Sequence, residues 1–268
     1  MEALVFGAIW IIVVILAEMG FDQIKAHSFY FIVTRQGMET QGAFNFLSQF
    51  LLAVFLFVVL FLIYTVIRFR APDLEPVKSR YHPVFNKGFI AFWVGLSFLL
   101  NIMFWLHPTA SDLEVMFSRD FPQKNRHDLV VDVTARQWEW IFSLPQYGIK
   151  QAVNAQGQDM LELPVGRRVE FRLRSYDPFH AYDVEAGVIH GFWVPAFGIK
   201  EDVIPGETRY EYVTPTRIAS YQTNPMVRVQ CSEVCGPGHP WMEAPLAIVS
   251  PKAFQQWVKY EQKLQLGS

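Results

Sequence analysis

The chain has 268 residues, which is enough for one or two domains, and a formal net charge of -2 at pH 7. So small a charge gives no strong attraction to nucleic acid, which excludes a protein that binds it by electrostatics. About half of the residues are hydrophobic and 16% are aromatic. This excess is not spread evenly along the chain, which points to membrane segments beside a soluble part.

Two long apolar runs predict transmembrane helices. Residues 44–67 and 88–106 carry no charge, and a helix that crosses the hydrocarbon core needs roughly 20 such residues. A third run, residues 3–17, is shorter and stops at Glu18. It is either a retained membrane helix or a signal peptide. We favour the retained helix, because "MEA" is not basic and no clear cleavage site follows.

The charges between these runs predict the orientation. The loop after residue 67 carries five basic residues (Arg68, Arg70, Lys78, Arg80 and Lys87), and the loop of residues 21–44 carries only two (Lys25 and Arg35). The positive-inside rule places the richer loop in the cytoplasm. Everything from residue 107 onward is therefore expected on the periplasmic or extracellular side of the cell membrane.

The sequence thus divides into three parts. Residues 1–43 hold the first helix and an outer loop, residues 44–106 a transmembrane hairpin, and residues 107–268 an outer domain. In the outer domain, period-two alternation over residues 129–135, 168–175, 208–214, 226–230 and 244–250 predicts short strands of a β-sandwich or barrel. A helix is expected at the end, where Ser250 can cap it and Pro251 suits its first position.

The stretch "CSEVCGPGHPWM" (231–242) contains both cysteines of the chain, Cys231 and Cys235, with His239 and Met242 after them. A disulfide would explain the cysteines alone, and chance in a turn is the other plain explanation. A metal site would use all four side chains, and thiolate, imidazole and thioether suit copper. Two thiolates are too many for a blue-copper site, but they can bridge two copper ions.

Two bridged ions would need a second histidine as a further strong ligand. His190, in "VIHGFWVP", is one candidate, and the other histidines expected on the outer side are His27, His107, His127 and His180. Spacing alone does not choose among them.

The sequence resembles subunit II of the haem–copper oxidases, the subunit that carries a dinuclear copper centre. The resemblance covers roughly residues 45–268. It rests on the transmembrane hairpin, "RQWEW" (136–140), "IHGFWVPAFGIKEDVIPGE" (189–207) and "CSEVCGPGHPWM". It implies a cupredoxin-like Greek-key β-barrel behind the membrane helices.

The resemblance also implies roles for individual residues. Cys231 and Cys235 would bridge the two coppers, with His190 and His239 on one copper each. Met242 and the carbonyl of Glu233 would be weak ligands, and the Glu233 side chain would reach a magnesium ion at the catalytic subunit. Trp138, with Trp140 as its companion, would receive electrons from the donor.

The function that the resemblance implies is that of an electron-accepting subunit of a terminal oxidase. A c-type cytochrome or a small copper protein would be the donor, and haem in a catalytic membrane subunit would be the acceptor and reduce O2 to water. No C-x-x-C-H motif occurs, so no c-type haem is expected in this chain. The family often has a glutamate near the start of the second hairpin helix, and "FNKGFIAF" offers none. This absence favours one alternative, the copper subunit of a nitric oxide reductase. A copper-binding membrane protein without electron transfer is a second alternative of a different class.

Overall fold

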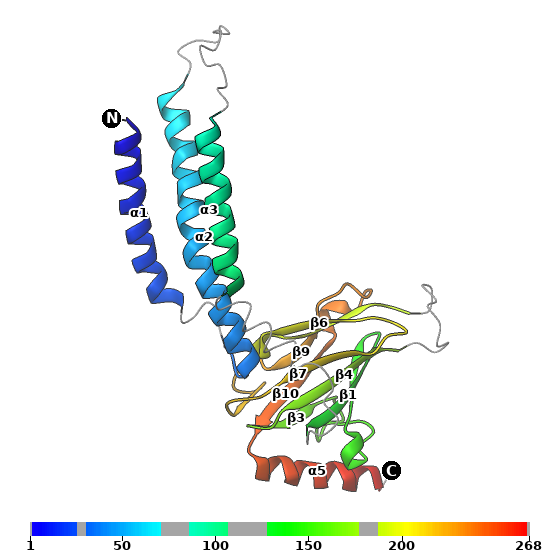
Figure 1. Ribbon diagram of the computed structural model, residues 1–268. Coiled ribbons are helices and arrows are strands. Elements are labelled where there is room, and N and C mark those ends of the chain that lie inside the picture. Colours follow the sequence, from blue (N-terminus) through cyan, green and yellow to red (C-terminus); the bar gives the residue numbers. More distant parts are fainter. Residues whose placement is uncertain (1, 26–30, 71–85, 107–127, 177–186, 267–268) are drawn as a thin grey trace. The chain divides into compact units, whose positions relative to one another are not determined.

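The computed structural model describes residues 2–25, 31–70, 86–106, 128–176 and 187–266. The chain forms two compact units, Met1–Ser28 with Gly42–Glu114, and Phe29–Gln41 with Val115–Ser268. The first unit is helical and the second contains the strands (Figure 1). The domain bounds expected from the sequence, 1–43, 44–106 and 107–268, stay a prediction. Residues 29–41 group with the strands, so the β unit draws on chain from both sides of the hairpin.

The long helices are α1 (Glu2–Ile24), α2 (Arg35–Arg68) and α3 (Lys87–Leu106). Within the described residues, these three are long and apolar enough to cross a membrane. The predicted runs 44–67 and 88–106 lie inside α2 and α3. The run that stops at Glu18 lies in a longer helix, because glutamate is a good helix former and does not end α1. Similarly, α2 begins at Arg35 rather than at Phe44.

The second unit consists of short strands and one long helix. Its elements are β1 (Leu129–Arg136), β2 (Glu139–Ser143), η2 (Pro145–Tyr147), β3 (Leu161–Pro164), β4 (Val169–Ser175), β5 (His190–Val194), η3 (Pro195–Phe197), β6 (Ile199–Val203), β7 (Arg209–Val213), β8 (Ala219–Ser220), β9 (Arg228–Cys231), η4 (His239–Trp241), β10 (Glu243–Val249) and α5 (Pro251–Leu266). The five strands predicted from alternation correspond to β1, β4, β7, β9 and β10. The fold class, membrane-type helices followed by a cupredoxin-like β domain, is confirmed.

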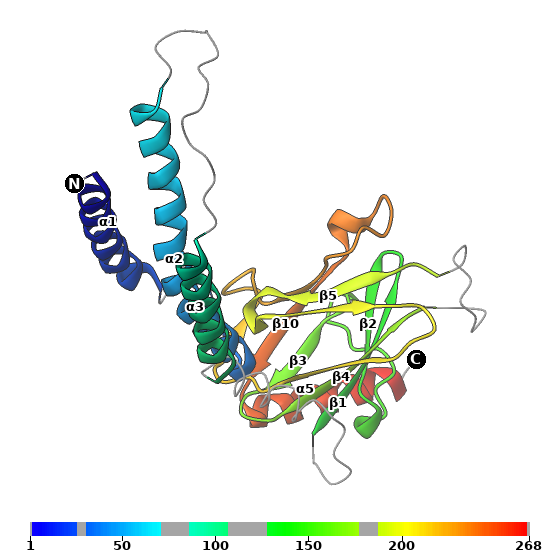
Figure 2. The same cartoon turned by 45° about the horizontal axis from the view of Figure 1, so that its top comes forward.

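The described strands form two sheets (Figure 2). One has the order β2-β1-β4-β7, and the other has the order β3-β10-β9-β5-β6 with β8 beside β10. β1 runs parallel to β4 and β3 runs parallel to β10, while the other pairs are antiparallel. The second sheet matters for function, because β5 and β9 are neighbours with Phe192 opposite Cys231.

Alternating side chains of both sheets form the core. On β1, Leu129, Val131 and Val133 are buried, and on β4 Phe171 and Leu173 are buried. These residues are the inward-facing half of the period-two pattern. Their burial removes apolar surface from water, which stabilises the folded state by about 25 cal/mol per Å². The expected end helix is also present. The backbone N–H of Ala253 donates to the Ser250 hydroxyl (3.2 Å), and α5 buries the predicted face of Phe254, Trp257 and Val258.

Residues 31–37 complete the β unit although they precede the membrane hairpin in the sequence. The Val33 N–H donates to the carbonyl of Ala196 (2.8 Å), and the Thr216 N–H donates to the carbonyl of Val33 (2.7 Å). Val33 and Thr34 are fully buried. At Gly37, a Cβ would lie 2.6 Å from the carbonyl oxygen of Phe197, so only glycine allows this approach. Since η3 directly follows β5, this segment supports the strand that begins at His190.

Candidate metal centre

The two cysteines lie on one loop that backbone hydrogen bonds hold closed. Cys231 ends β9, and its N–H donates to the carbonyl of Met242 at the other end of the loop (3.0 Å). The next residue, Ser232, donates its N–H to the carbonyl of Gly191 on β5 (3.0 Å). The loop is therefore fixed both to itself and to the strand that carries the candidate upstream histidine.

The candidate ligand atoms form a continuous chain of contacts. Nδ1 of His190 lies 3.7 Å from Sγ of Cys231, which lies 3.7 Å from Sγ of Cys235. Sγ of Cys235 lies 3.6 Å from Nδ1 of His239 and 3.8 Å from Sδ of Met242. Sγ of Cys231 also lies 3.2 Å from the carbonyl oxygen of Glu233. Each thiol therefore has an imidazole of its own and one weaker donor beside it.

His190 is brought to the cysteines by its place on β5. The strand begins at this residue and buries its side chain almost completely, at 1% exposure. Its ring lies 6.2 Å from that of Trp140, which in turn packs edge-on against Phe192 at 5.7 Å. Aromatic side chains thus surround the buried side of the cluster and keep water from it.

Burial sets the protonation of the cluster. It lowers the pKa of His190 to about 4, and the nearby His239 adds to this shift. Burial, followed by the hydrogen bond and charge of Cys231, raises the pKa of the Cys235 thiol to about 12. Without a bound cation, burial disfavours the imidazolium form of His190 and the thiolate form of Cys235, because both charged groups lose solvation. The neutral imidazole of His190 can offer a lone pair to a metal ion, and a bound metal ion would displace the thiol proton of Cys235.

The donor separations fit metal ligation. Ligands that share an ion tetrahedrally, with bonds of about 2.0–2.3 Å, have donor atoms roughly 3.3–3.8 Å apart. The imidazole–thiol and thiol–thiol distances here are 3.6–3.7 Å. The ligand atoms of His190, Cys231 and Cys235 all lie within 4.8 Å of one another. Two thiols, two imidazoles and a thioether are also the soft donor set that suits copper.

The indole of Trp138 covers the cysteine loop. Its Nε1–H donates to the carbonyl of Cys235 (3.0 Å), and Nε2 of Gln137 donates to the same oxygen (2.7 Å). The ring lies flat against Gly238, where a Cβ would approach Trp138 Cδ2 to 2.3 Å. The side chain of Trp138 remains 41% exposed. It thus connects the protein surface to a candidate metal ligand through one hydrogen bond.

Trp140, its expected companion, is in a different position. It is only 1% exposed, and its Nε1–H donates to the carbonyl of Met242 (3.3 Å). On β2, successive side chains point to opposite faces. Trp138 precedes the strand and reaches the surface, whereas Trp140 enters the core beside His190. Of the two tryptophans, Trp138 is the one that a protein partner could touch.

Glu233 and Lys200 form an ion pair at the edge of the site. The carboxylate of Glu233 lies 3.2 Å from Nζ of Lys200, and both side chains are largely exposed. The carbonyl of Glu233 faces inward to Cys231, while its carboxylate faces outward. Glu233 thus faces the cluster with its backbone and Lys200 with its side chain.

Sequence reasoning did not identify two contributors to the site. Gln137 shares the Cys235 carbonyl with Trp138, and Gly238 makes room for the indole. The two glycines of "CGPGH" were the available signal, because glycine in a loop often marks a close approach. The other candidate histidines, His27, His107, His127 and His180, lie outside the described residues.

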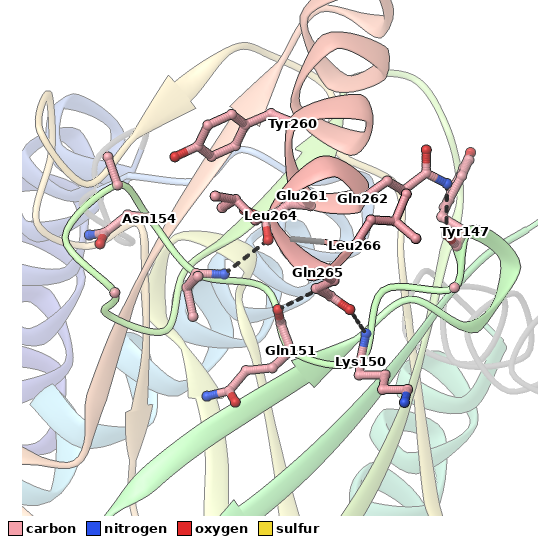
Figure 3. A pocket seen from close by; sticks show the side chains of 14 residues that line it. Tyr147, Lys150, Gln151, Asn154, Tyr260, Glu261, Gln262, Leu264, Gln265 and Leu266 are labelled. Carbon is pink, nitrogen blue, oxygen red and sulfur yellow. Dashed lines mark hydrogen bonds between the residues drawn. The ribbon is translucent and has the colours of Figure 1, made fainter. Parts of the chain in front are cut away.

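A cavity of about 1100 Å³ lies elsewhere in the β unit. It is lined by α5 and by the segment that follows η2, and Tyr147, Gln151 and Glu261 are among its residues (Figure 3). None of the candidate ligands or tryptophans lines it. In the cluster itself, His190, Cys231, Cys235 and Met242 are buried and His239 is half-buried, and a smaller cavity of about 250 Å³ reaches His190.

Comparison with known proteins identifies this β unit. A sequence model described as "Cytochrome C oxidase subunit II, periplasmic domain" matches residues 129–250. These residues contain all members of the cluster, namely His190, Cys231, Glu233, Cys235, His239 and Met242. Residues 129–250 thus match the cytochrome c oxidase subunit II family. The resemblance stated from the sequence is therefore confirmed.

Individual relatives have the same description. The chain is 36% identical to cytochrome c oxidase subunit 2 of Thermostichus vulcanus over 139 residues, 51% of this chain and 35% of the relative. It is 28% identical to that of Bacillus subtilis over 199 residues, 73% of this chain and 51% of the relative. The chain thus spans between a third and about half of the length of these relatives.

A solved structure is similar in sequence to the same region. It is the periplasmic domain of subunit II of cytochrome oxidase of Bradyrhizobium japonicum, 26% identical, with a TM-score of 0.41. The match covers 53% of this chain and 98% of that domain.

Proposed function

We propose that this chain is the electron-accepting subunit of a membrane-bound haem–copper oxidase. In this proposal it receives electrons from a c-type cytochrome at a dinuclear copper centre and passes them to haem in a catalytic subunit, where O2 is reduced to water. The observation that carries the proposal is the arrangement of one imidazole beside each of two touching thiols. The match of residues 129–250 to the subunit II family supports it.

The proposed ligands divide the work between strong and weak donors. Cys231 and Cys235 would hold both ions, and His190 and His239 would hold one each. Met242 and the Glu233 carbonyl would complete the two positions. Two copper ions held in this way supply one-electron chemistry, because a single electron can be shared between them. The loop that carries these ligands is fixed at Met242 and Gly191, so its atoms need to move little during transfer.

Trp138 is the residue on which we propose the donor to dock. It is exposed, flat on the loop and bonded to the carbonyl of Cys235. A ring in this position offers a donor protein a contact and a short covalent and hydrogen-bonded route to a ligand. Trp140, buried against His190, would shield the buried side of the cluster from water.

The remaining parts of the proposal concern the membrane and the partner. The three apolar helices would anchor the chain in the cell membrane, with the β unit on the periplasmic or extracellular side. The Glu233 carboxylate would contribute to a magnesium site at the contact with the catalytic subunit. It would then exchange its present partner, Lys200, for the ion.

The test uses the full chain purified from membranes with copper in the growth medium. We expect two copper ions per chain and an electron paramagnetic resonance spectrum in which one unpaired electron couples to both nuclei. A Cys231→Ser variant should lose that coupling. One copper with a blue-copper spectrum, or zinc in place of copper, would contradict the dinuclear centre.

The acceptor is tested separately, in the complex with its catalytic subunit. Consumption of O2 with reduced cytochrome c is expected. Consumption of nitric oxide without O2 uptake would instead assign the chain to a nitric oxide reductase. A copper-loaded chain that no c-type cytochrome reduces rapidly would indicate a copper-binding protein without electron transfer.

A further inference from the structure

Contacts near both ends of helix α1 join it to α2. Near the start of α1, the ring of Phe6 lies 5.7 Å from that of Phe57 and 5.9 Å from that of Phe61. One turn further, the ring of Trp10 lies 5.6 Å from that of Phe57. These rings meet edge to face, the geometry that aromatic pairs favour. The residues on α1 are four apart and so share one face of the helix.

The contact includes a hydrogen bond within the apolar part of both helices. Nε1 of Trp10 donates to the backbone carbonyl of Ala53 on α2 (3.0 Å). In a membrane interior no water can satisfy an indole N–H, so a helix that carries tryptophan at this depth needs a protein acceptor. The bond therefore fixes both the rotation and the depth of α1 against α2.

Polar contacts hold the two ends of the pair. At one end Arg68 binds Glu2 with a distance of 2.8 Å from Nη2 to Oε1. At the other end Nδ2 of Asn45 donates to the carbonyl of Lys25 (2.9 Å), the residue that follows α1. Gln49, four residues along α2, donates to Asp22 (3.3 Å). Asn45 and Gln49 are polar residues in an otherwise apolar run, and α1 provides partners for both.

The opposite face of α1 has the character of a lipid-facing surface. Its large side chains are mostly exposed in the chain by itself, among them Leu4, Ile12, Leu16 and Met19. An amphipathic surface helix would instead show charge on that face. Residues 3–17 of the helix are thus apolar all round, with aromatic specificity toward α2.

We propose that residues 2–24 are a membrane helix of the working protein, seated on the face of α2 that carries Ala53, Phe57 and Phe61. A catalytic subunit would then reach α2 only over the surface that α1 leaves free. This inference rests on the membrane location in the proposed function, but it does not depend on the copper centre.

The first test uses the full chain purified from membranes, and measures its intact mass and the products of photo-crosslinking. With benzoylphenylalanine in place of Phe57, we expect the mass of a chain that retains residues 2–24 and a crosslink into residues 2–24. The same probe at Leu62, an exposed position on another face of α2, should not crosslink there. A mature chain that begins beyond residue 24, or a Phe57 probe that reaches only lipid or another subunit, would overturn the proposal.

Two variants make the test specific. Trp10→Ala removes the bond to Ala53 and should lower the yield of the Phe57 crosslink severalfold. Ile12→Ala, on the exposed face, removes a side chain of comparable apolarity and should leave the yield unchanged. Equal yields in both would show that no specific interface exists. The copper spectrum of the same samples reports separately on the proposed function, so failure of one leaves the other standing.

Discussion

The indole Nε1–H of Trp138 donates a 3.0 Å hydrogen bond to the carbonyl oxygen of Cys235. We expect Trp138→Phe to keep the copper spectrum but to slow reduction by a c-type cytochrome roughly tenfold, which corresponds to about 1.4 kcal/mol. The reason is that phenylalanine keeps an aromatic surface but lacks the N–H. Stopped-flow reduction measures the rate. Tyr210→Phe, an exposed aromatic position on β7, is the control and should react as the wild type does.

Gly238 leaves room for the Trp138 ring, so a methyl group there should disturb the site. A Cβ would lie 2.3 Å from Trp138 Cδ2, and we expect Gly238→Ala to cost about 1–3 kcal/mol of stability. The copper spectrum should change with it, because His239 is the next residue. Gly157→Ala is strained by its positive φ but faces open space. It should lower the melting temperature without altering the spectrum, and a normal spectrum in Gly238→Ala would contradict this view.

Met242 should tune the centre rather than hold it. It is fully buried with Sδ 3.8 Å from Sγ of Cys235. Met242→Leu conserves volume, and we expect it to cost less than about 1.5 kcal/mol. Two copper ions per chain should remain while the reduction potential shifts, which metal analysis and redox titration measure. Loss of both ions would show that the thioether is a strong ligand.

Much of this site was predictable because its ligands are close in sequence. Cys231, Cys235, His239 and Met242 lie within twelve residues, and their side-chain types already indicate copper. His190 was different, because its contact with Cys231 depends on the pairing of β5 with β9. Residue spacing does not encode that pairing, so the family resemblance supplied it. The burial of Trp140 and the role of Gln137 also depend on tertiary structure.

The fold likewise has elements that the local sequence pattern predicts and elements that depend on tertiary structure. Alternation found the strands in which every second residue is buried, such as β1 and β4. It did not find β5, where "HGFWV" is almost wholly buried and has no polar face. Nor could local pattern show that Val33 belongs to the β unit, because its hydrogen-bond partners lie more than 160 residues away.

Thr34 connects that segment to the β unit. Its Oγ1–H donates to the carbonyl of Phe197 (2.6 Å), and Oγ1 accepts the Gly37 N–H (3.1 Å). Thr34→Val keeps the shape but leaves buried groups unpaired, and we expect a loss of about 1–3 kcal/mol. Thermal unfolding of the full chain measures it. Thr40→Val is the matched control, since its hydroxyl only bonds the carbonyl of Gln36 on the same helix. Equal melting temperatures for the two variants would refute a special role for Thr34.

Glu261 should make stability depend on pH. Its carboxyl is buried in α5 beside the segment that follows η2 (Figure 3). Oε2 accepts only the distant Val153 N–H (3.5 Å), and Oε1 has no hydrogen-bond partner in the part of the chain that the structure describes. Burial raises the pKa of Glu261, and burial with the charge of Glu261 raises the pKa of Glu162.

A raised carboxyl pKa means that the folded state holds its proton more tightly than the unfolded chain. This contribution is fully present below the ordinary pKa of about 4.3 and is lost as pH rises through the raised pKa. We therefore expect Glu261→Gln to raise the melting temperature at pH 7 and to change it little at pH 4. Glu170→Gln, at a carboxylate paired with Arg172, should not do so. A wild-type melting temperature that climbs steadily from pH 4 to pH 7 while Glu261→Gln does not would refute the sign.

The participation of residues 31–37 in the β unit has a practical consequence for anyone who wishes to prepare that unit in soluble form. A gene fragment that starts at residue 107 omits Val33 and Thr34, and so exposes the carbonyls of Ala196 and Phe197 just beyond the His190 strand. Such a fragment would have an open seam at the end of β5 that lies away from His190. Adding residues 31–37 back, as a fused strand or as a separate peptide, would close it.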